Sequence, residues 1–136
     1  MSLEITEADL KNALPDVTSN LRLSGLTELV EVYRDHWGIP HIKAKNENDL
    51  FFAQGFVTAQ DRLWHMDYDR YRALGRWAEL TGPNGVEQDK LLRGAGMGRT
   101  AKLDYEMACP ESKAMIDAYT TGVLSLIHTP SPRDRG

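Results

Sequence analysis

The sequence predicts an α+β chain that is mostly helical and carries one small β-hairpin near its N-terminus. Two β-rich runs, residues 29–34 and 39–44, are separated by a short turn that contains a glycine. After residue 46 the apolar residues recur at helical spacing over most of the remaining chain. The length of 136 residues fits a single domain.

Composition and charge exclude several classes of protein. The chain holds 16 Lys and Arg against 20 Asp and Glu, a formal charge of −4, whereas nucleic-acid binders normally show a basic excess. The single cysteine rules out an intrachain disulfide and any multi-cysteine zinc site. No apolar run approaches the length of a membrane span. The N-terminus lacks the basic start and apolar stretch of a secretory signal, which predicts a cytoplasmic protein or one that has already lost a leader.

The N-terminal part is expected to contain a short helix and then strands. Loosely helical spacing predicts a helix over Glu4–Leu14, which Pro15 would stop. The alternation in Leu21–Leu23 suggests a short edge strand. The hairpin is predicted over Leu29–Arg34 and Ile39–Ala44, with its turn at residues 35–38 and Pro40 near the start of the second strand, since proline cannot donate to a ladder.

A long helical region follows the hairpin. Asn46 or Asn48 is suited to cap its start, and residues 81–85 (TGPNG) are a strong stop signal. Two neighbouring apolar stripes give this region a face wider than one packing partner needs. Gly55 and Gly75 interrupt the pattern and mark either close packing or a helix break.

Two further helices complete the prediction. One is expected over Val86–Ala108, weakened by three glycines, and the next is expected to open at Pro110, because proline tolerates the first helical turn. Residues 1–128 are therefore interpreted as the folded domain. Residues 129–136 are polar, contain two prolines and lack periodicity, which predicts an irregular tail.

The glycines at residues 94–98 (GAGMG) invite a dinucleotide-binding interpretation. It fails because Arg99 stands where the fingerprint needs glycine, and because no strand is predicted before it. A flexible or closely packed helix junction is the better interpretation.

The histidines and the acidic residue near the hairpin are candidate metal ligands. Asp35, His36 and His41 lie close in sequence, but nothing completes a coordination shell, so His41 is interpreted as a structural donor or acceptor and no metal ligand is assigned. Asp61 and Arg62 interrupt an apolar stretch. They are interpreted as an ion pair or helix-end network, the alternative being an acid/base pair.

Nucleophiles are scarce. Cys109 has no histidine close in sequence, and no Gly-x-Ser-x-Gly elbow exists. Ser2 would become an N-terminal nucleophile after loss of Met1, yet it leads a polar segment that is unsuited to an oxyanion site. The three tryptophans and five tyrosines could line a pocket, but such residues are more often core or interface anchors, and their pattern alone does not decide between these roles. No catalytic residue is assigned, and substrate-binding residues stay unknown.

Four segments of the chain resemble the penicillin amidase (penicillin acylase) family, and together they span about residues 26–123. They are Val32–Ala44 (VYRDHWGIPHIKA), Asp49–Met66 (DLFFAQGFVTAQDRLWHM), Gly75–Gly82 (GRWAELTG) and Ala118–Val123 (AYTTGV). The match is ordered and covers most of the chain.

The resemblance implies a fragment of an αββα N-terminal nucleophile hydrolase. Members are precursors that cut themselves into an α chain and a larger β chain, and the β chain begins with the catalytic serine. They hydrolyse amide bonds of penicillins, acyl-homoserine lactones or related N-acyl compounds. This chain resembles only the first part of the α chain, so the family implies a β chain of the same precursor as its partner. The calcium that many members bind is held mostly by groups of the β chain, and no cofactor is expected in this chain.

Near its end the sequence departs from the family pattern. Leu124 follows the Gly-Val pair where the family usually has Asn, which suggests a sequence that is truncated or frame-shifted there. Two alternatives to an amidase portion stay open. One is a stand-alone, non-catalytic helical binding module or inactive remnant, and the other is autonomous catalysis by Ser2. The wide apolar face further predicts that the isolated chain self-associates.

Overall fold

The computed structural model describes residues 5–128 of the chain. It confirms an α+β chain that is mostly helical with one two-stranded antiparallel hairpin. The elements are α1 (Glu7–Asn12), β1 (Glu31–Arg34), β2 (Pro40–Lys43), α2 (Glu47–Ala73), α3 (Ala78–Thr81), the 3₁₀ turn η1 (Gly82–Gly85), α4 (Val86–Ala95), α5 (Met97–Met107) and α6 (Pro110–His128). None of the helices within residues 5–128 combines the length and the apolar character needed to cross a bilayer.

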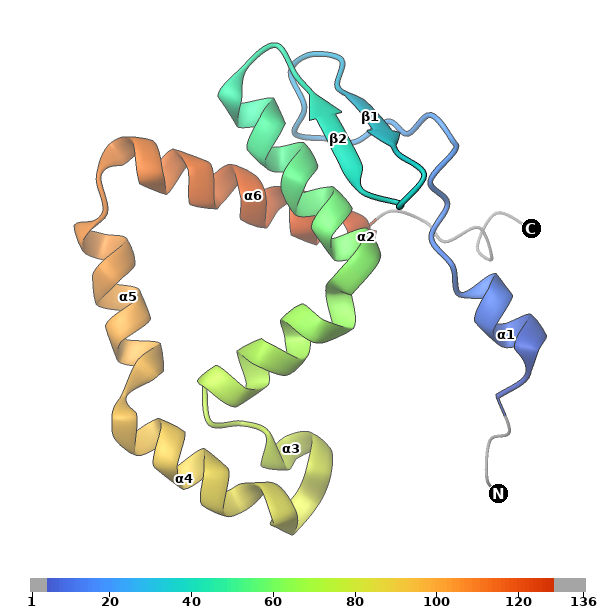
Figure 1. Ribbon diagram of the computed structural model, residues 1–136. Coiled ribbons are helices and arrows are strands. Elements are labelled where there is room, and N and C mark those ends of the chain that lie inside the picture. The colour runs from blue at the N-terminus through green and yellow to red at the C-terminus, as the bar shows by residue number, and fades with distance from the viewer. Residues whose placement is uncertain (1–4, 129–136) are drawn as a thin grey trace.

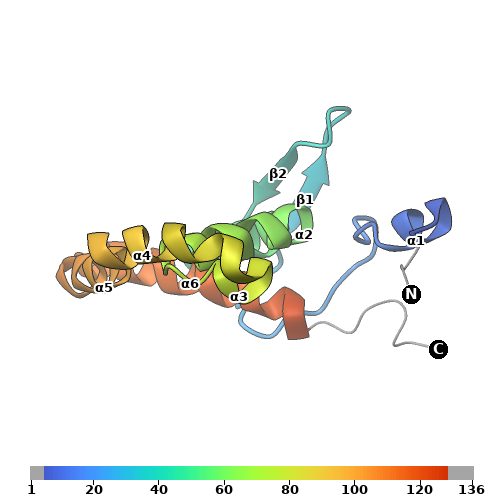
Figure 2. The ribbon, with the colours of Figure 1, turned by 90° about the horizontal axis from the view of Figure 1, so that it is seen from below.

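Helices α2 to α6 follow one another around an open loop, and α6 returns to cross the first half of α2 (Figure 1). Seen from below, these five helices lie in nearly one layer, while the hairpin rises from one side of it (Figure 2). The core lies where α2 and α6 cross. Its buried apolar side chains are Phe52, Ala53, Phe56, Val57, Ala59 and Ala118.

The segment before the hairpin is less regular than predicted. The first helix covers only Glu7–Asn12, where Thr6 and Asp9 form a capping box. The predicted edge strand Leu21–Leu23 is wrong, because that segment has irregular backbone and the hairpin pairs only with itself. Leu21 and Leu23 are half-buried and Arg22 is exposed, so the alternation reflects packing rather than strand pairing.

The hairpin is confirmed, with slightly shorter strands than predicted. Val32 pairs with Ile42, and Arg34 pairs with Pro40, so the proline lies at the start of the second strand as expected. Gly38 adopts a φ of +77° in the turn, a conformation that a side chain would strain.

Helix α2 begins at the predicted cap but ends earlier than the stop signal. The side chain of Asn46 accepts from the backbone N–H of Asp49. The helix then kinks at Arg62, whose φ and ψ of −143° and 24° are not helical. It ends at Ala73 because Gly75 takes a φ of +62°. The short helix α3 and the turn η1 follow, where the sequence predicted the end of the long helix and its stop signal.

The predicted single helix Val86–Ala108 is wrong. The chain forms two helices instead, α4 and α5, because Gly96 adopts a left-handed conformation with a φ of +72° between them. The next helix does open at Pro110, as predicted.

Candidate functional site

The most buried polar group of the described chain is the carboxylate of Asp49, which is fully inaccessible. It accepts hydrogen bonds from the backbone N–H of Thr27 at 2.9 Å, the Thr27 hydroxyl at 2.8 Å, the Glu28 N–H at 2.9 Å and the side-chain amide of Asn46 at 2.7 Å. These donors, led by the Thr27 N–H, lower the pKa of Asp49 to about 2 despite burial. A carboxylate held ionised in this way anchors the segment before the hairpin to the start of α2 and is unsuited to proton transfer near neutral pH.

A second buried carboxylate, Asp89 of α4, plays a similar part at the start of α3. Its two oxygens accept from the backbone N–H groups of Trp77 and Ala78, each at 2.8 Å. They satisfy the free N–H groups of a helix start from a distant position in the chain. Neither carboxylate was predicted from the sequence to have a structural role. Asp49 had a recognisable signal, since it lies three residues after its cap, whereas the partners of Asp89 lie eleven and twelve residues earlier and leave no local pattern.

The structure brings together two of the three residues considered as metal ligands at the hairpin. His41 Nε2 lies 3.2 Å from Asp35 Oδ2, and the other carboxylate oxygen accepts from the N–H groups of Trp37 and Ile39 at 2.9 Å each. Burial opposes ionisation, but these hydrogen bonds prevail and lower the pKa of Asp35. His41 therefore has the structural role that was predicted for it.

His36 does not join this pair, because its ring packs against that of Trp37, with 4.6 Å between centroids. Over residues 5–128 no three His, Cys, Asp or Glu side chains come together in a way that could hold a metal ion. His65 pairs with Asp69 on the exposed surface of α2, while Ser2 and the side chain of His128 lie outside the part that the structure describes.

Asp61 and Arg62 do not form an acid/base pair with each other. Asp61 instead receives two hydrogen bonds from the guanidinium of Arg34, at 2.9 and 3.0 Å, and Arg34 also donates to the Gly38 carbonyl. The ion pair joins the hairpin to α2 immediately before the kink at Arg62, which agrees with the interpretation that it determines how the helix docks.

The one cysteine is exposed at the start of α6. Its thiol contacts the Ser112 hydroxyl at 3.2 Å, and this hydrogen bond lowers the pKa of Cys109. The aromatic side chains do not gather around one site. Trp37 on the hairpin is 77% exposed and Trp64 on α2 is 66% exposed, whereas Trp77 packs edge-on against Tyr68.

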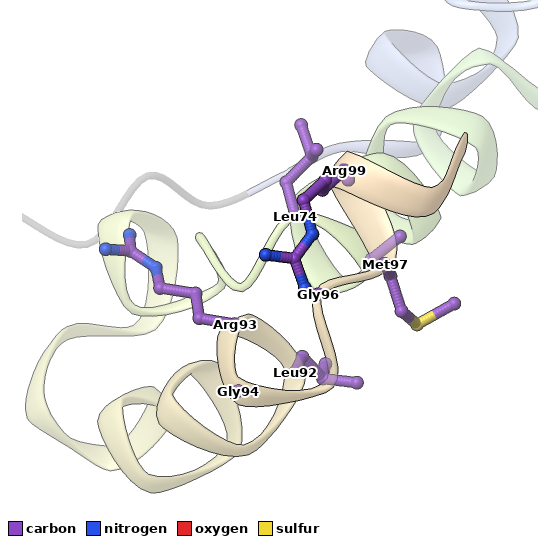
Figure 3. Close-up of a pocket in the computed structure, with 9 residues that line it drawn as sticks. Leu74, Leu92, Arg93, Gly94, Gly96, Met97 and Arg99 are labelled. Atoms are coloured by element: carbon purple, nitrogen blue, oxygen red, sulfur yellow. The ribbon is translucent and has the colours of Figure 1, made fainter. Parts of the chain in front are cut away.

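The glycines at 94–98 line a pocket of about 330 Å³ between the end of α2 and the junction of α4 and α5. Its apolar lining includes Leu74 and Met97, and the guanidinium groups of Arg93 and Arg99 lie apart from each other (Figure 3). Arg93 Nε donates to the Gly75 carbonyl at 2.7 Å and so serves the end of α2. Because helix α4 precedes the glycines, the strand–turn–helix context of a dinucleotide site does not exist here.

Comparison with known proteins decides the family. The family model described as penicillin amidase matches residues 29–133, more than half of the chain. The chain belongs to the penicillin amidase family. The matched region extends into residues 129–133, which lie outside the described part of the structure.

Individual members of the penicillin amidase family support the assignment. The chain is 42% identical over 132 residues to the penicillin acylase 2 proenzyme of Pseudomonas sp. (strain SE83), which covers 97% of this chain and 17% of the relative. It is 32% identical over 117 residues to the acyl-homoserine lactone acylase QuiP of Pseudomonas aeruginosa, covering 86% of this chain and 14% of the relative. The chain thus spans less than a fifth of the curated relatives that it matches.

The fold agrees with the same family. A thermostable penicillin G acylase from Alcaligenes faecalis is similar with a TM-score of 0.66 and 27% identity, over 74% of this chain and 53% of that chain. About three quarters of this chain therefore shares its fold with part of a penicillin acylase.

Proposed function

We propose that this chain is part of the α region of an amidase that hydrolyses the amide bond of penicillin-like or other N-acyl compounds. The catalytic N-terminal serine would lie on a separate β chain. The observation that carries the proposal is the 42% identity to a penicillin acylase proenzyme over nearly the whole chain, combined with coverage of only 17% of that protein. The names of the relatives point to acyl amides as the substrate class.

The chemistry of the described residues supports a framing role. The buried carboxylates of Asp49 and Asp89 are committed to backbone N–H donors, and Asp61 is committed to Arg34. Asp49 and Asp89 are buried, and Asp61 is held in an ion pair with Arg34, so none of the three is placed as an accessible general base. The function proposed for residues 5–128 is therefore to hold the hairpin and the α2–α6 crossing in place beside the reacting part of the enzyme.

A chimera tests the proposal. The matched region of the Pseudomonas sp. SE83 proenzyme is replaced by this chain, and the purified product is assayed for maturation into two chains and for hydrolysis of several N-acyl amides. We expect maturation and activity for the chimera and no hydrolysis by the 136-residue chain alone. The matched control is the same chimera with Gly55→Leu. A side chain at this position would overlap the carbonyl oxygen of Tyr119, so α2 and α6 could not cross as they do. A folded chimera that neither matures nor hydrolyses, or deacylation by the chain alone, would contradict the proposal. A folded chimera that is inactive would favour a non-catalytic binding module or an inactive remnant.

A further inference from the structure

Two parts of the chain are stabilised in different ways. The buried apolar side chains of residues 5–128 lie in the first half of α2 and in α6. Within residues 63–107 the buried residues are Gly75, Gly85 and Asp89, none of which adds an apolar side chain to a core. We name residues 63–107 the arm, and we name the hairpin, residues 47–61 of α2 and α6 the body. A segment that buries little apolar surface is held less firmly than the core.

The arm has internal order that comes from hydrogen bonds. The carboxylate of Asp89 in α4 accepts from the backbone N–H groups of Trp77 and Ala78 at the start of α3, at 2.8 Å each. Arg93 Nε of α4 donates to the carbonyl of Gly75, just beyond the end of α2, at 2.7 Å. These contacts join the second half of α2, α3 and α4 into one unit.

The arm meets the body at two breaks in helical backbone. Arg62 in α2 has φ and ψ of −143° and 24°, and Ala108, between α5 and α6, has φ and ψ of −61° and 146°. The body is fixed up to the first break, because Arg34 holds Asp61. Figure 1 shows the arm leaving the α2–α6 crossing at the kink and returning at the start of α6. Residues at the ends of elements are those that absorb backbone changes when parts of a protein move about hinges.

Hydrogen bonds between α5 and α6 link the arm to the body. The Tyr105 hydroxyl donates to Asp117 Oδ1 at 2.7 Å, and Lys113 Nζ donates to the Glu106 carbonyl at 2.8 Å. Both bonds are exposed, so water competes for the same donors and acceptors and their net contribution is small. They hold the arm in its described position less firmly than the core holds the body.

We infer that the arm swings as one unit about Arg62 and Ala108 while the body stays in place. The swing breaks exposed hydrogen bonds between α5 and α6. It leaves the apolar core of the body and the hydrogen bonds to Asp89 intact. The fold thereby contains a strap, attached at both ends, that changes position without unfolding the α2–α6 crossing. The inference concerns this chain alone and does not depend on the proposed amidase function.

Distances between pairs of nitroxide labels, measured by double electron–electron resonance, test the swing. Each label replaces an exposed side chain in a Cys109→Ser background, and labelled chain is diluted with unlabelled chain so that distances within one molecule are measured. The pairs are Lys43→Cys with Leu91→Cys across body and arm, Leu80→Cys with Leu103→Cys within the arm, and Lys43→Cys with Thr120→Cys within the body. We expect the first distribution to be about twofold or more wider than the other two.

A variant of the α5–α6 contact sharpens the test. Tyr105→Phe removes the hydrogen bond to Asp117 and should widen the distribution across body and arm, while the distributions within each part stay unchanged. Tyr33→Phe in the hairpin is the matched control and should leave all three unchanged. Equal widths for the three pairs would overturn the inference. A wide distribution within the arm would also overturn it, because the arm would then not move as a unit.

Limited trypsin digestion of the unsubstituted chain gives a second measurement that needs no label. Arg62 and Arg70 are both exposed residues of α2, but Arg62 alone of the two lies at the proposed hinge. Cleavage after Arg62 should be about fivefold or more faster than cleavage after Arg70, because a protease needs locally opened backbone. Equal rates at the two arginines would contradict a hinge at the kink.

Discussion

Gly55 of α2 and Gly122 of α6 lie in reciprocal contact where the two helices cross. A Cβ atom on Gly122 would overlap the carbonyl oxygen of Phe52, and one on Gly55 would overlap the carbonyl oxygen of Tyr119. Each glycine therefore lets its helix approach the backbone of the other. The resulting contact is the main tertiary contact between distant helices in the described chain.

We predict that Gly122→Ala destabilises the chain by roughly 2–4 kcal/mol, because the added methyl group meets backbone atoms that cannot move aside independently. Urea unfolding followed by helical circular dichroism measures the change. Gly94→Ala is the control, since a Cβ there meets nothing within 4 Å, and it should be neutral or stabilise the chain by about 0.5–1 kcal/mol. Equal midpoints for the two variants would show that the crossing is looser than described.

The pH dependence of stability should reflect Asp49. Its pKa is about 2 in the folded chain against an ordinary value of 3.8, so the unfolded state binds the proton more tightly. The stabilisation is complete above about pH 4 and is lost as the pH falls toward 2. Unfolding curves recorded from pH 5 to pH 2 should therefore decline in this window for the parent chain.

Asp49→Asn should make that decline smaller and lower stability at neutral pH, because the amide replaces one acceptor oxygen by a donor facing the Thr27 and Glu28 N–H groups. Asp16→Asn is the comparison. The pKa of Asp16 is also lowered to about 2, but its donors, Thr18 and Ser19, come from its own turn. A larger neutral-pH loss for Asp16→Asn than for Asp49→Asn would contradict the anchoring role of Asp49.

The ion pair between Arg34 and Asp61 should make a modest but measurable contribution to the stability of the chain. Its side chains are 18% and 32% exposed, and the pairing is bidentate, so Arg34→Lys is expected to cost about 1 kcal/mol through loss of the second hydrogen bond. Lys43→Gln in the same hairpin removes a pair that is 85% and 64% exposed and should change stability by less than about 0.5 kcal/mol. The difference between the two should shrink in high salt, and a cost that is equal at both sites would argue against the assigned geometry.

Self-association of the isolated chain remains a prediction. Apolar side chains such as Leu91, Trp64 and Met107 are 73%, 66% and 85% exposed. Exposed apolar surface of this kind favours association in water. Sedimentation at increasing concentration, together with binding of an apolar dye, should reveal oligomers. A monomer at high concentration that binds little dye would reject the prediction.

Local patterns predicted those parts of the fold that depend on local chemistry. The hairpin, Asn46 as a helix cap and Pro110 as a helix start each follow from a few neighbouring residues. The kink at Arg62 lies directly after Asp61, whose partner Arg34 is 27 residues away, and no local pattern predicts either feature.

In the candidate site, too, contacts between residues close in sequence were predicted and contacts between distant residues were not. The role of His41 was predicted because its partner Asp35 lies six residues earlier in the same hairpin. The importance of Gly122 was missed because its neighbour, Phe52, lies on a different helix. The division of residues 86–108 into two helices was missed because three glycines were present and only Gly96 has a left-handed conformation.

The anchoring of Asp49 has a practical consequence for trimming the polypeptide. The family match begins at residue 29, whereas three of the four hydrogen bonds to this carboxylate come from Thr27 and Glu28. A shortened protein cut at the family boundary would keep the buried anion and lose most of the groups that solvate it. The smallest unit expected to fold therefore starts upstream of Thr27, outside the limits that sequence similarity alone would suggest.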